Sequence, residues 1–259
     1  MSIQPVGLHL RQWRQKRRMS QLDLACEAEI STRHLSFIET GRSTPSRLMI
    51  LKLAEQLDVP VRERNVLLVS GGFAPMFPER GLDDPALAAA RWAIDAVLAA
   101  QKPYPAFAID RGWTLLANNG ALPQMYEGVA PHLLEGKVNG LRLTLHPEGL
   151  ARKIENLGEW RAHLLGRLQR QIDLTADRGL SDLMAELKTY PAPAAGRSAP
   201  SDALMAPLRL RIGGERLSFY STTMVFGSPV DVTLSEIAVE SFIPADAHTI
   251  ACVRNLPPG

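Results

Sequence analysis

Residues 20–45 hold two short helical patterns separated by only a few residues, and this spacing sharply limits how the chain can fold. Ser20 precedes the first pattern, 21–28, and Gly41 ends the second, 32–40. Apolar residues recur at helical spacing through both patterns and the break between them: Leu24, Ala25, Ala28, Ile30, Leu35 and Ile38. Because such spacing places them on one face, the two helices are predicted to pack against each other over a shared core.

The second helical pattern keeps a more polar face outside that core. The residues on this face are Thr32, Arg33, Ser36 and Phe37. Two short helices, a tight turn and a polar second helix are the layout of a helix-turn-helix, whose second helix enters the major groove of DNA. The pattern therefore predicts that double-stranded DNA is a partner of this chain.

The positive charge of the chain is concentrated in the same region. Residues 1–70 contain 11 Lys and Arg against 7 Asp and Glu, whereas residues 71–259 contain 18 against 20. An excess of positive charge favours binding to phosphates. The asymmetry agrees with the motif but is too small to indicate DNA binding by itself.

Composition and cysteine usage restrict the remaining classes of protein. A chain of 259 residues with 46% apolar residues can fill one or two cores. Cys26 and Cys252 lie far apart and neither has a partner nearby in sequence, which favours a reducing compartment. Residues 1–7 do not resemble a secretory start, and no window reaches the ~18 apolar residues of a membrane helix. We expect a soluble cytoplasmic protein with no membrane partner.

Residues 1–72 are predicted to form an all-α DNA-binding domain of five short helices. Their ranges are 8–18, 21–28, 32–40, 46–57 and 61–69. Ser46 is expected to cap the fourth helix, and Gly71 with Gly72 to end the fifth. Residues 73–102 are predicted to form a junction rich in Gly and Pro, followed by a helix that Asp84 caps and Pro85 begins.

Residues 103–259 alternate between strand-like and helix-like patterns, which predicts an α+β domain with an antiparallel sheet. Strands are predicted at 105–110 and 113–118 around a turn, and a hairpin at 208–226 around Gly213-Gly214. The other segments are predicted as helix at 119–127, extended or irregular chain at 138–145, one long helix at 147–173, helix at 181–190, surface loop at 191–203 and strand at 231–242.

The segment SQLDLACEAEISTRHLSFIETGRSTPS resembles the helix-turn-helix of Cro- and lambda-repressor-like proteins, the XRE family. The matching residues are Ser20-Gln21, Leu24-Ala25, Ile30-Ser31, Ser36, Ile38-Glu39, Gly41-Arg42 and Pro45-Ser46. The family usually has Gly in the turn, where this chain has Glu29. A side chain there costs about 1 kcal/mol if the residue needs a positive φ, which a folded domain tolerates.

This resemblance implies two kinds of DNA contact. Gln21 and Arg42 would contact phosphates, Gln21 together with the N-terminal amides of its own helix. Thr32, Arg33 and Ser36 would face the groove, and Arg33 can bind a guanine edge through two hydrogen bonds.

Two further residues on or beside this face have two interpretations each. His34 lies near the groove or is partly packed, and Phe37 touches a thymine methyl group or packs sideways. The alternative for the whole set is that these are ordinary solvated side chains of a small helical domain.

The rest of the chain resembles the C-terminal domain of MmyB-like regulators, through residues 71–75, 103–119, 138–165 and 226–246. That resemblance implies a PAS-like fold and, for some members, a fatty-acid-like ligand, with no required cofactor. Seven residues in or near the predicted sheet elements are the candidate lining of a lipid-sized cavity: Phe107, Leu116, Met125, Tyr126, Leu143, Met224 and Phe226. The alternative is that they fill an ordinary core, because an apolar pattern alone does not distinguish the two.

The sequence has no recognisable catalytic or metal-binding motif. It lacks a GxSxG turn, a P-loop and an HExxH helix. Three histidines lack the spacing typical of metal ligands: His132, His146 and His163. Asp110, Trp113 and Asn118 are interpreted as a turn residue, a core anchor and a helix cap rather than as ligand contacts. We therefore expect neither an enzyme nor a metal site.

Together the helix-turn-helix pattern and the two resemblances imply a sequence-specific transcriptional repressor that binds DNA as a homodimer and responds to a small apolar ligand. Two alternatives stay open. Residues 103–259 could form an enzyme that carries a DNA-binding appendage, or an antitoxin-like module that binds another protein.

Overall fold

The computed structural model describes residues 4–175, 177–191, 206–227 and 231–255. The predicted surface loop at 191–203 lies, except for Pro191, outside these residues. The chain divides into two compact units, of which the first contains the residues up to Gly81 together with the stretch that ends at Ser235. The second contains the rest of the chain. That the DNA-binding domain ends at residue 72 and the ligand-binding domain begins after residue 102 stays a prediction.

Residues 4–72 form the five predicted α-helices, which confirms an all-α N-terminal domain. They are α1 (Val6–Lys16), α2 (Gln21–Glu27), α3 (Thr32–Glu39), α4 (Arg47–Gln56) and α5 (Val61–Ser70). Five of the six apolar residues predicted for the shared core are buried, and Ile30 is half-buried. The period of the apolar pattern therefore predicted the packed face of α2 and α3 correctly.

Serine side chains cap the helices of the motif. Ser20 and Asp23 form a capping box at the start of α2, with Ser20 Oγ accepting from Asp23 N at 3.1 Å. Ser31 Oγ accepts from His34 N at 3.1 Å, and Ser46 Oγ from Met49 N at 3.2 Å. Each cap satisfies an amide that the helix itself leaves unpaired, so each fixes a helix start locally.

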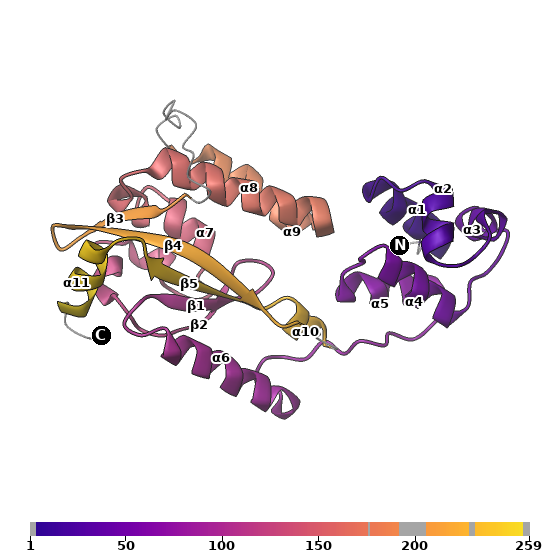
Figure 1. Cartoon of the computed structure of the whole chain (residues 1–259), viewed down its shortest axis with the longest axis horizontal. Helices are drawn as coiled ribbons and strands as arrows, with labels where there is room; N and C mark the ends of the chain where they lie inside the picture. The colour runs from indigo at the N-terminus through magenta and orange to yellow at the C-terminus, as the bar shows by residue number, and fades with distance from the viewer. Residues whose placement is uncertain (1–3, 176, 192–205, 228–230, 256–259) are drawn as a thin grey trace. The chain divides into compact units, whose positions relative to one another are not determined.

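The second unit is built on a five-stranded antiparallel sheet in the order β2-β1-β5-β4-β3 (Figure 1). The strands are β1 (Ala106–Ile109), β2 (Leu115–Asn118), β3 (Leu208–Ile212), β4 (Glu215–Val225) and β5 (Ala238–Pro244). Both predicted hairpins, β1–β2 and β3–β4, are confirmed. The central pairing of β1 with β5 places Phe107 opposite Glu240, so residues distant in sequence meet in the middle of the sheet.

Several helices complete the described part of this unit. They are η1 (Pro85–Leu87), α6 (Ala88–Ala100), η2 (Pro123–Tyr126), η3 (Pro131–Leu133), α7 (Gly140–Leu145), η4 (Leu150–Lys153), α8 (Leu157–Thr175), α9 (Arg178–Thr189) and α11 (Ala247–Asn255). Asp84 caps the turn that Pro85 begins, as predicted, by accepting from Ala86 N at 2.8 Å. Helices α8 and α9 contact each other along their length (Figure 1). The α11 helix was not predicted.

The single long helix predicted at 147–173 is wrong. The chain forms the short η4, breaks at residues 154–156 and continues as α8. At the break, Glu155 N donates to Arg209 O at 2.9 Å and Asn156 Nδ2 donates to Pro207 O at 2.8 Å. Hydrogen bonds to a strand some 50 residues away replace those of a continuing helix, and no local pattern reveals them.

Three shorter segments also differ from prediction. Residues 138–145 contain the helix α7, because Asn139 Oδ1 accepts from Leu141 N and Arg142 N at 3.1 Å and so caps it. Residues 119–127 contain only the short η2, since Gly120 and Leu122 have positive φ values of 67° and 53° that break a helix. Residues 231–242 contain α10 (Val232–Ser235) before β5, because Asp231 Oδ1 accepts from Thr233 N at 2.9 Å.

Candidate DNA-binding helix and apolar cavity

The helix α3 is held in place by a buried ion pair. Arg14 of α1 donates from Nε to Glu39 Oε1 at 2.6 Å and from Nη2 to Glu39 Oε2 at 2.9 Å. Gln21 Nε2 donates to the same Oε2 at 2.8 Å. Glu39 ends α3 and is 5% exposed, so one carboxylate fixes α3 against both α1 and α2. A phosphate contact by Gln21 stays a prediction, and this bond holds its side chain at the start of α2.

The outer face of α3 carries the predicted base-reading residues. Arg33 is exposed, whereas Thr32, His34, Ser36 and Phe37 are half-buried. The centroid of the Phe37 ring lies 5.3 Å from the Arg33 guanidinium carbon and 5.9 Å from that of Arg42. These two contacts put Phe37 beside both arginines that were predicted to contact DNA, and a contact of Phe37 itself with DNA stays a prediction.

The turn between α2 and α3 has a positive φ at Glu29, the conformation in which a side chain was expected to cost stability. Glu29 has φ +50°, so its side chain carries the cost that Gly would avoid. Glu29 also accepts a hydrogen bond from Lys52 Nζ at 2.9 Å, and this bond holds the pKa of Glu29 below its usual value. The Glu29–Lys52 pair joins the turn to α4.

The second unit contains a mainly apolar cavity of about 60 Å³. Its walls come from the sheet, α7, α8, η2 and η4; they include Phe107, Trp113, Leu115, Met125, Tyr126, Leu141, Leu143, Ile154, Trp160, Leu164, Arg167, Phe219, Ser221, Glu240 and Phe242. A site for a drug-sized molecule has roughly 300–1,000 Å³. A lipid-sized ligand therefore requires the walls to move apart.

Four of the seven predicted lining residues are in these walls: Phe107, Met125, Tyr126 and Leu143. The other three, Leu116, Met224 and Phe226, are not. Side chains alternate between the two faces of a strand, so Leu115 faces the cavity and its neighbour Leu116 is 36% exposed. Met224 is 50% exposed near the end of β4, and Phe226 follows that strand. None of the three is in the wall of this cavity, so a ligand contact by them stays a prediction.

Comparisons with known families agree with both parts of the chain. A family model described as MmyB-like transcription regulator ligand binding domain matches residues 90–256, and one described as Helix-turn-helix matches residues 10–64. The chain belongs to the MmyB-like transcription regulators. It is a DNA-binding regulator with an XRE-type helix-turn-helix and a domain for a small-molecule ligand. A comparison with curated proteins finds no match. In the described residues of this MmyB-like regulator, no helix has the length and apolar character needed to cross a membrane.

An ion pair forms part of the wall of the regulator's cavity. Arg167 of α8 donates to both oxygens of Glu240 on β5, from Nη2 to Oε1 at 2.5 Å and from Nη1 to Oε2 at 3.0 Å. Ser221 Oγ and Thr223 Oγ1 donate to the same carboxylate at 2.9 Å and 2.8 Å. Glu240 is only 1% exposed. No local sequence signal indicates this pair, because its members are 73 residues apart.

Two tryptophans of the cavity wall differ in how their indole N–H groups are satisfied. Trp113 Nε1 donates to Gln171 Oε1 at 2.8 Å, whereas Trp160 Nε1 is buried and has no hydrogen-bond partner among the described residues. Trp160 stacks on His163 with ring centroids 5.1 Å apart. Burial and the nearby Arg167 and Arg170 lower the pKa of His163.

The turn before β2 positions Trp113 in the cavity wall. Asp110 Oδ1 accepts from Gly112 N and Thr114 N, both at 2.8 Å, as expected of a turn residue. Trp113 has φ +63°, an uncommon conformation for a bulky residue. Asn118 does not cap a helix; its Oδ1 accepts from Gly120 N at 2.9 Å in a turn. Trp113 is thus both a core residue and part of the cavity.

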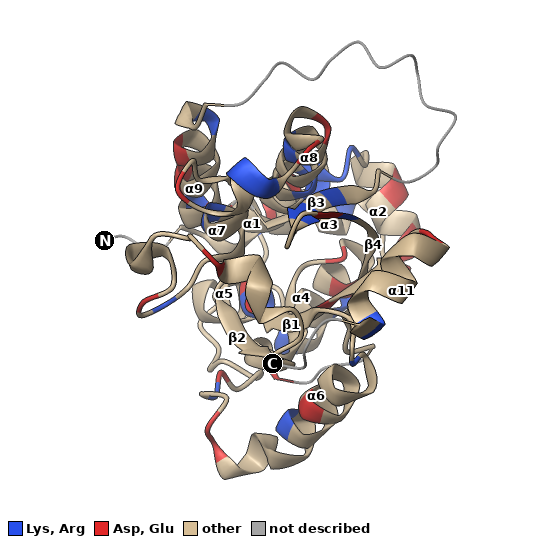
Figure 2. Ribbon diagram, turned by 90° about the vertical axis from the view of Figure 1, so that its left-hand side faces the viewer, with Lys and Arg blue, Asp and Glu red and all other residues tan. Residues whose placement is uncertain are grey.

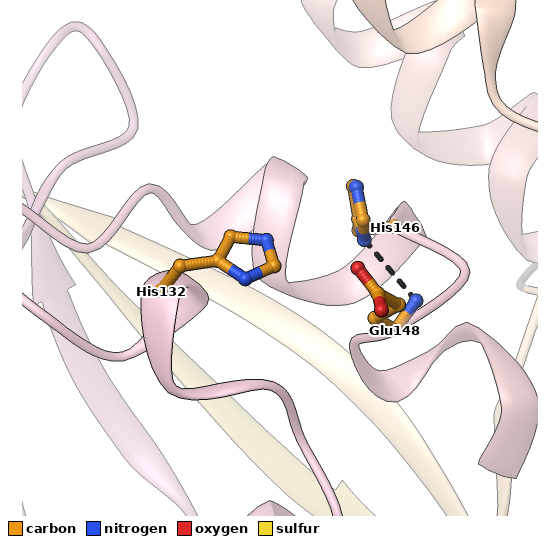
Figure 3. A group of neighbouring side chains, drawn as sticks. All are labelled: His132, His146 and Glu148. Carbon is orange, nitrogen blue, oxygen red and sulfur yellow. Dashed lines mark hydrogen bonds between the residues drawn. The ribbon is translucent and has the colours of Figure 1, made fainter.

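The fold brings together two histidines that sequence spacing separates. Potential ligand atoms of His132, His146 and Glu148 lie within 4.8 Å of one another (Figure 3). However, His146 Nδ1 accepts from Glu148 N at 3.1 Å, which in a neutral ring places the proton on Nε2. A histidine binds a metal through an unprotonated nitrogen. The expected lack of a metal site stays a prediction.

Proposed function

We propose that this MmyB-like regulator is a sequence-specific repressor whose DNA affinity changes when a small apolar molecule, fatty-acid-like or similar, occupies the cavity. The observation that carries the proposal is the apolar cavity in a chain that also holds α3 rigidly with its polar face outward. The antiparallel sheet beside the cavity supports a PAS-like second domain. A cytoplasmic location stays part of the proposal.

The segment between β4 and β5 supports a route from the ligand to the DNA-binding unit. Its described residues 231–235 belong to the first unit. There Val232 N donates to Pro78 O at 2.8 Å, and Asp231, 2% exposed, accepts from Arg80 Nη1 at 2.9 Å. The two strands that this segment joins carry Ser221 and Glu240 of the cavity wall. A ligand can change DNA affinity only if it binds two conformations of the protein with unequal affinity. We propose that these conformations differ by a shift of β4 against β5, which moves the segment 231–235.

A homodimer is the proposed DNA-binding form, with α6 as part of the contact between two copies. Trp92 is 73% exposed, and Ala89, Ala96 and Ala99 are also exposed on α6. The helix has few charged residues (Figure 2). A second copy presenting the same face would cover these apolar side chains. A homodimer would supply two α3 helices to a palindromic site, whose half-sites lie about one DNA turn apart.

The function is tested by selection from a random oligonucleotide pool at moderate ionic strength, with native mass spectrometry of the same full-length preparation. We expect a common palindromic word, a dimer and a retained small molecule whose extraction changes DNA affinity. A pool without a common word would contradict DNA reading, and unchanged affinity after extraction would contradict the ligand response. Turnover of a ligand would instead favour the enzyme alternative, and one stoichiometric protein partner the antitoxin-like alternative.

A further inference from the structure

The charged groups of the cavity wall already satisfy each other. Arg167 and Glu240 are the charged residues among those that line it. The Glu240 carboxylate accepts four hydrogen bonds, two from Arg167 and one each from Ser221 and Thr223. The guanidinium also lies over the Trp113 ring, 4.9 Å from its centroid. The cavity therefore offers no cation without an anion beside it.

A ligand carboxylate is poorly suited to such a wall. It would approach Arg167 next to Glu240, whose negative charge is already buried there. Two carboxylates in one desolvated site repel each other, so one of them must lose its charge or its partner. A neutral head group avoids this conflict.

One residue of the cavity wall carries a hydrogen-bond donor that has no acceptor among the described residues. Trp160 is 2% exposed and lines the cavity, and its Nε1 has no partner among the described residues. A buried N–H that is not hydrogen-bonded is costly, so an acceptor supplied by a ligand would be favoured. Trp160, Leu164 and Arg167 occupy one face of α8, which places the donor and the ion pair about two helical turns apart with an apolar residue between them.

We propose that the cavity binds a neutral medium-chain carbonyl compound and discriminates against the corresponding fatty acid. The carbonyl oxygen accepts from Trp160 Nε1, and the alkyl chain lies against the apolar wall that includes Leu164. The inference rests on the proposed ligand response and names the ligand class of that same site. The volume of about 60 Å³ favours a short chain, which needs the smallest movement of the walls.

Three eight-carbon probes separate the contributions of head group and chain: 2-octanone, octanoate and 1-octene. Binding to the full-length protein after removal of retained ligand is measured by calorimetry at pH 7.5, where octanoate is ionised. We expect 2-octanone to bind at least about tenfold more tightly than octanoate or 1-octene, the size of one hydrogen bond. Equal or tighter binding of octanoate would overturn the inference. Binding of none of the three would overturn the ligand response as well.

Two variants test whether Trp160 and Glu240 cause the preference for 2-octanone over octanoate. Trp160→Phe removes the donor and should lower the affinity for 2-octanone to that for 1-octene, whereas Trp13→Phe, in the other unit, should change neither. Glu240→Gln removes the buried negative charge and should shift the preference toward octanoate, because Arg167 then lacks its anion. Unchanged 2-octanone affinity in Trp160→Phe would overturn the inference even if Glu240→Gln does not fold.

Discussion

Arg14 and Glu39 form a two-point ion pair inside the DNA-binding unit, with N–O distances of 2.6 and 2.9 Å. Arg14 is 8% exposed and Glu39 is 5% exposed. The hydrogen bonds that Arg14 donates to the Glu39 carboxylate raise the pKa of Arg14 above its usual value. Arg14 also donates from Nη1 to Met19 O at 2.7 Å, so the pair joins α1, the start of α2 and the end of α3.

Glu39→Leu should lower the free energy of unfolding by about 3–5 kcal/mol, because it leaves the Arg14 guanidinium buried without its anion. Urea denaturation followed by circular dichroism measures the change. The double variant Arg14→Met with Glu39→Leu should recover most of the loss, since apolar residues can replace a buried pair at little cost. A single variant as stable as the wild type would contradict a structural role for the pair.

Gly7→Ala should destabilise the DNA-binding unit, because a Cβ at this position would lie 2.0 Å from Ile38 O where α1 meets α3. We expect a loss of about 1–3 kcal/mol and weaker DNA binding, as for other overpacked cores. The control is Gly166→Ala on α8, whose Cβ would meet only Arg170 Nη1 at 3.8 Å. That change should raise stability by up to about 1 kcal/mol through helix propensity. Thermal denaturation measures the stability of both variants. A Gly7→Ala protein as stable as the wild type would contradict the close approach of α1 to α3 at this position.

Arg33→Ala should relax the preference at one base position by about 1–3 kcal/mol per half-site, because Arg33 is exposed on α3 and an arginine can bind a guanine edge. Arg42→Ala is the matched control, because Arg42 also lies over the Phe37 ring. It should weaken binding to all sequences alike and reduce the salt dependence, as loss of a phosphate contact does. Binding titrations against single-base operator variants distinguish the two; identical base preferences for Arg33→Ala and wild type would remove the base-reading role.

Trp92→Glu should convert the proposed dimer to a monomer, because it places a charge in the centre of the exposed apolar face of α6. Light scattering after gel filtration reports the mass, and affinity for a palindromic site should fall with it. Leu174→Glu on α8, where the leucine is 50% exposed, is the control and should leave the mass unchanged. A Trp92→Glu protein that stays dimeric would show that the interface between the two copies does not include this face of α6.

Stability should decrease as the pH falls below about 6.5, in part through His163. Burial, Arg167 and Arg170 lower the pKa of this residue in the folded state, so the unfolded chain takes up the proton at a higher pH. Burial lowers the pKa of His9 in the same direction. His163→Phe keeps a ring beside Trp160 and should flatten the pH dependence of the melting temperature, whereas His132→Phe should not. Equal slopes for all three proteins would contradict this role.

Local signals in the sequence predicted most of the helix-turn-helix. The apolar period, the serine caps and the Gly turns act within a few residues, so they are visible in sequence order; Ser20, Ser46 and Gly71 are examples. The two strand hairpins were predicted for the same reason. Such signals report where an element begins and which of its faces is apolar.

The sequence by itself determined the helices of the DNA-binding unit, the hairpins and the family to which the chain belongs. The tertiary structure decided where the helix predicted at 147–173 breaks, because the backbone at Glu155 bonds to Arg209. It also placed Arg167 and Glu240 together in one cavity wall and turned Leu116 away from it. These features depend on hydrogen bonds and packing between segments 50 or more residues apart, and such contacts leave no periodic trace in either segment.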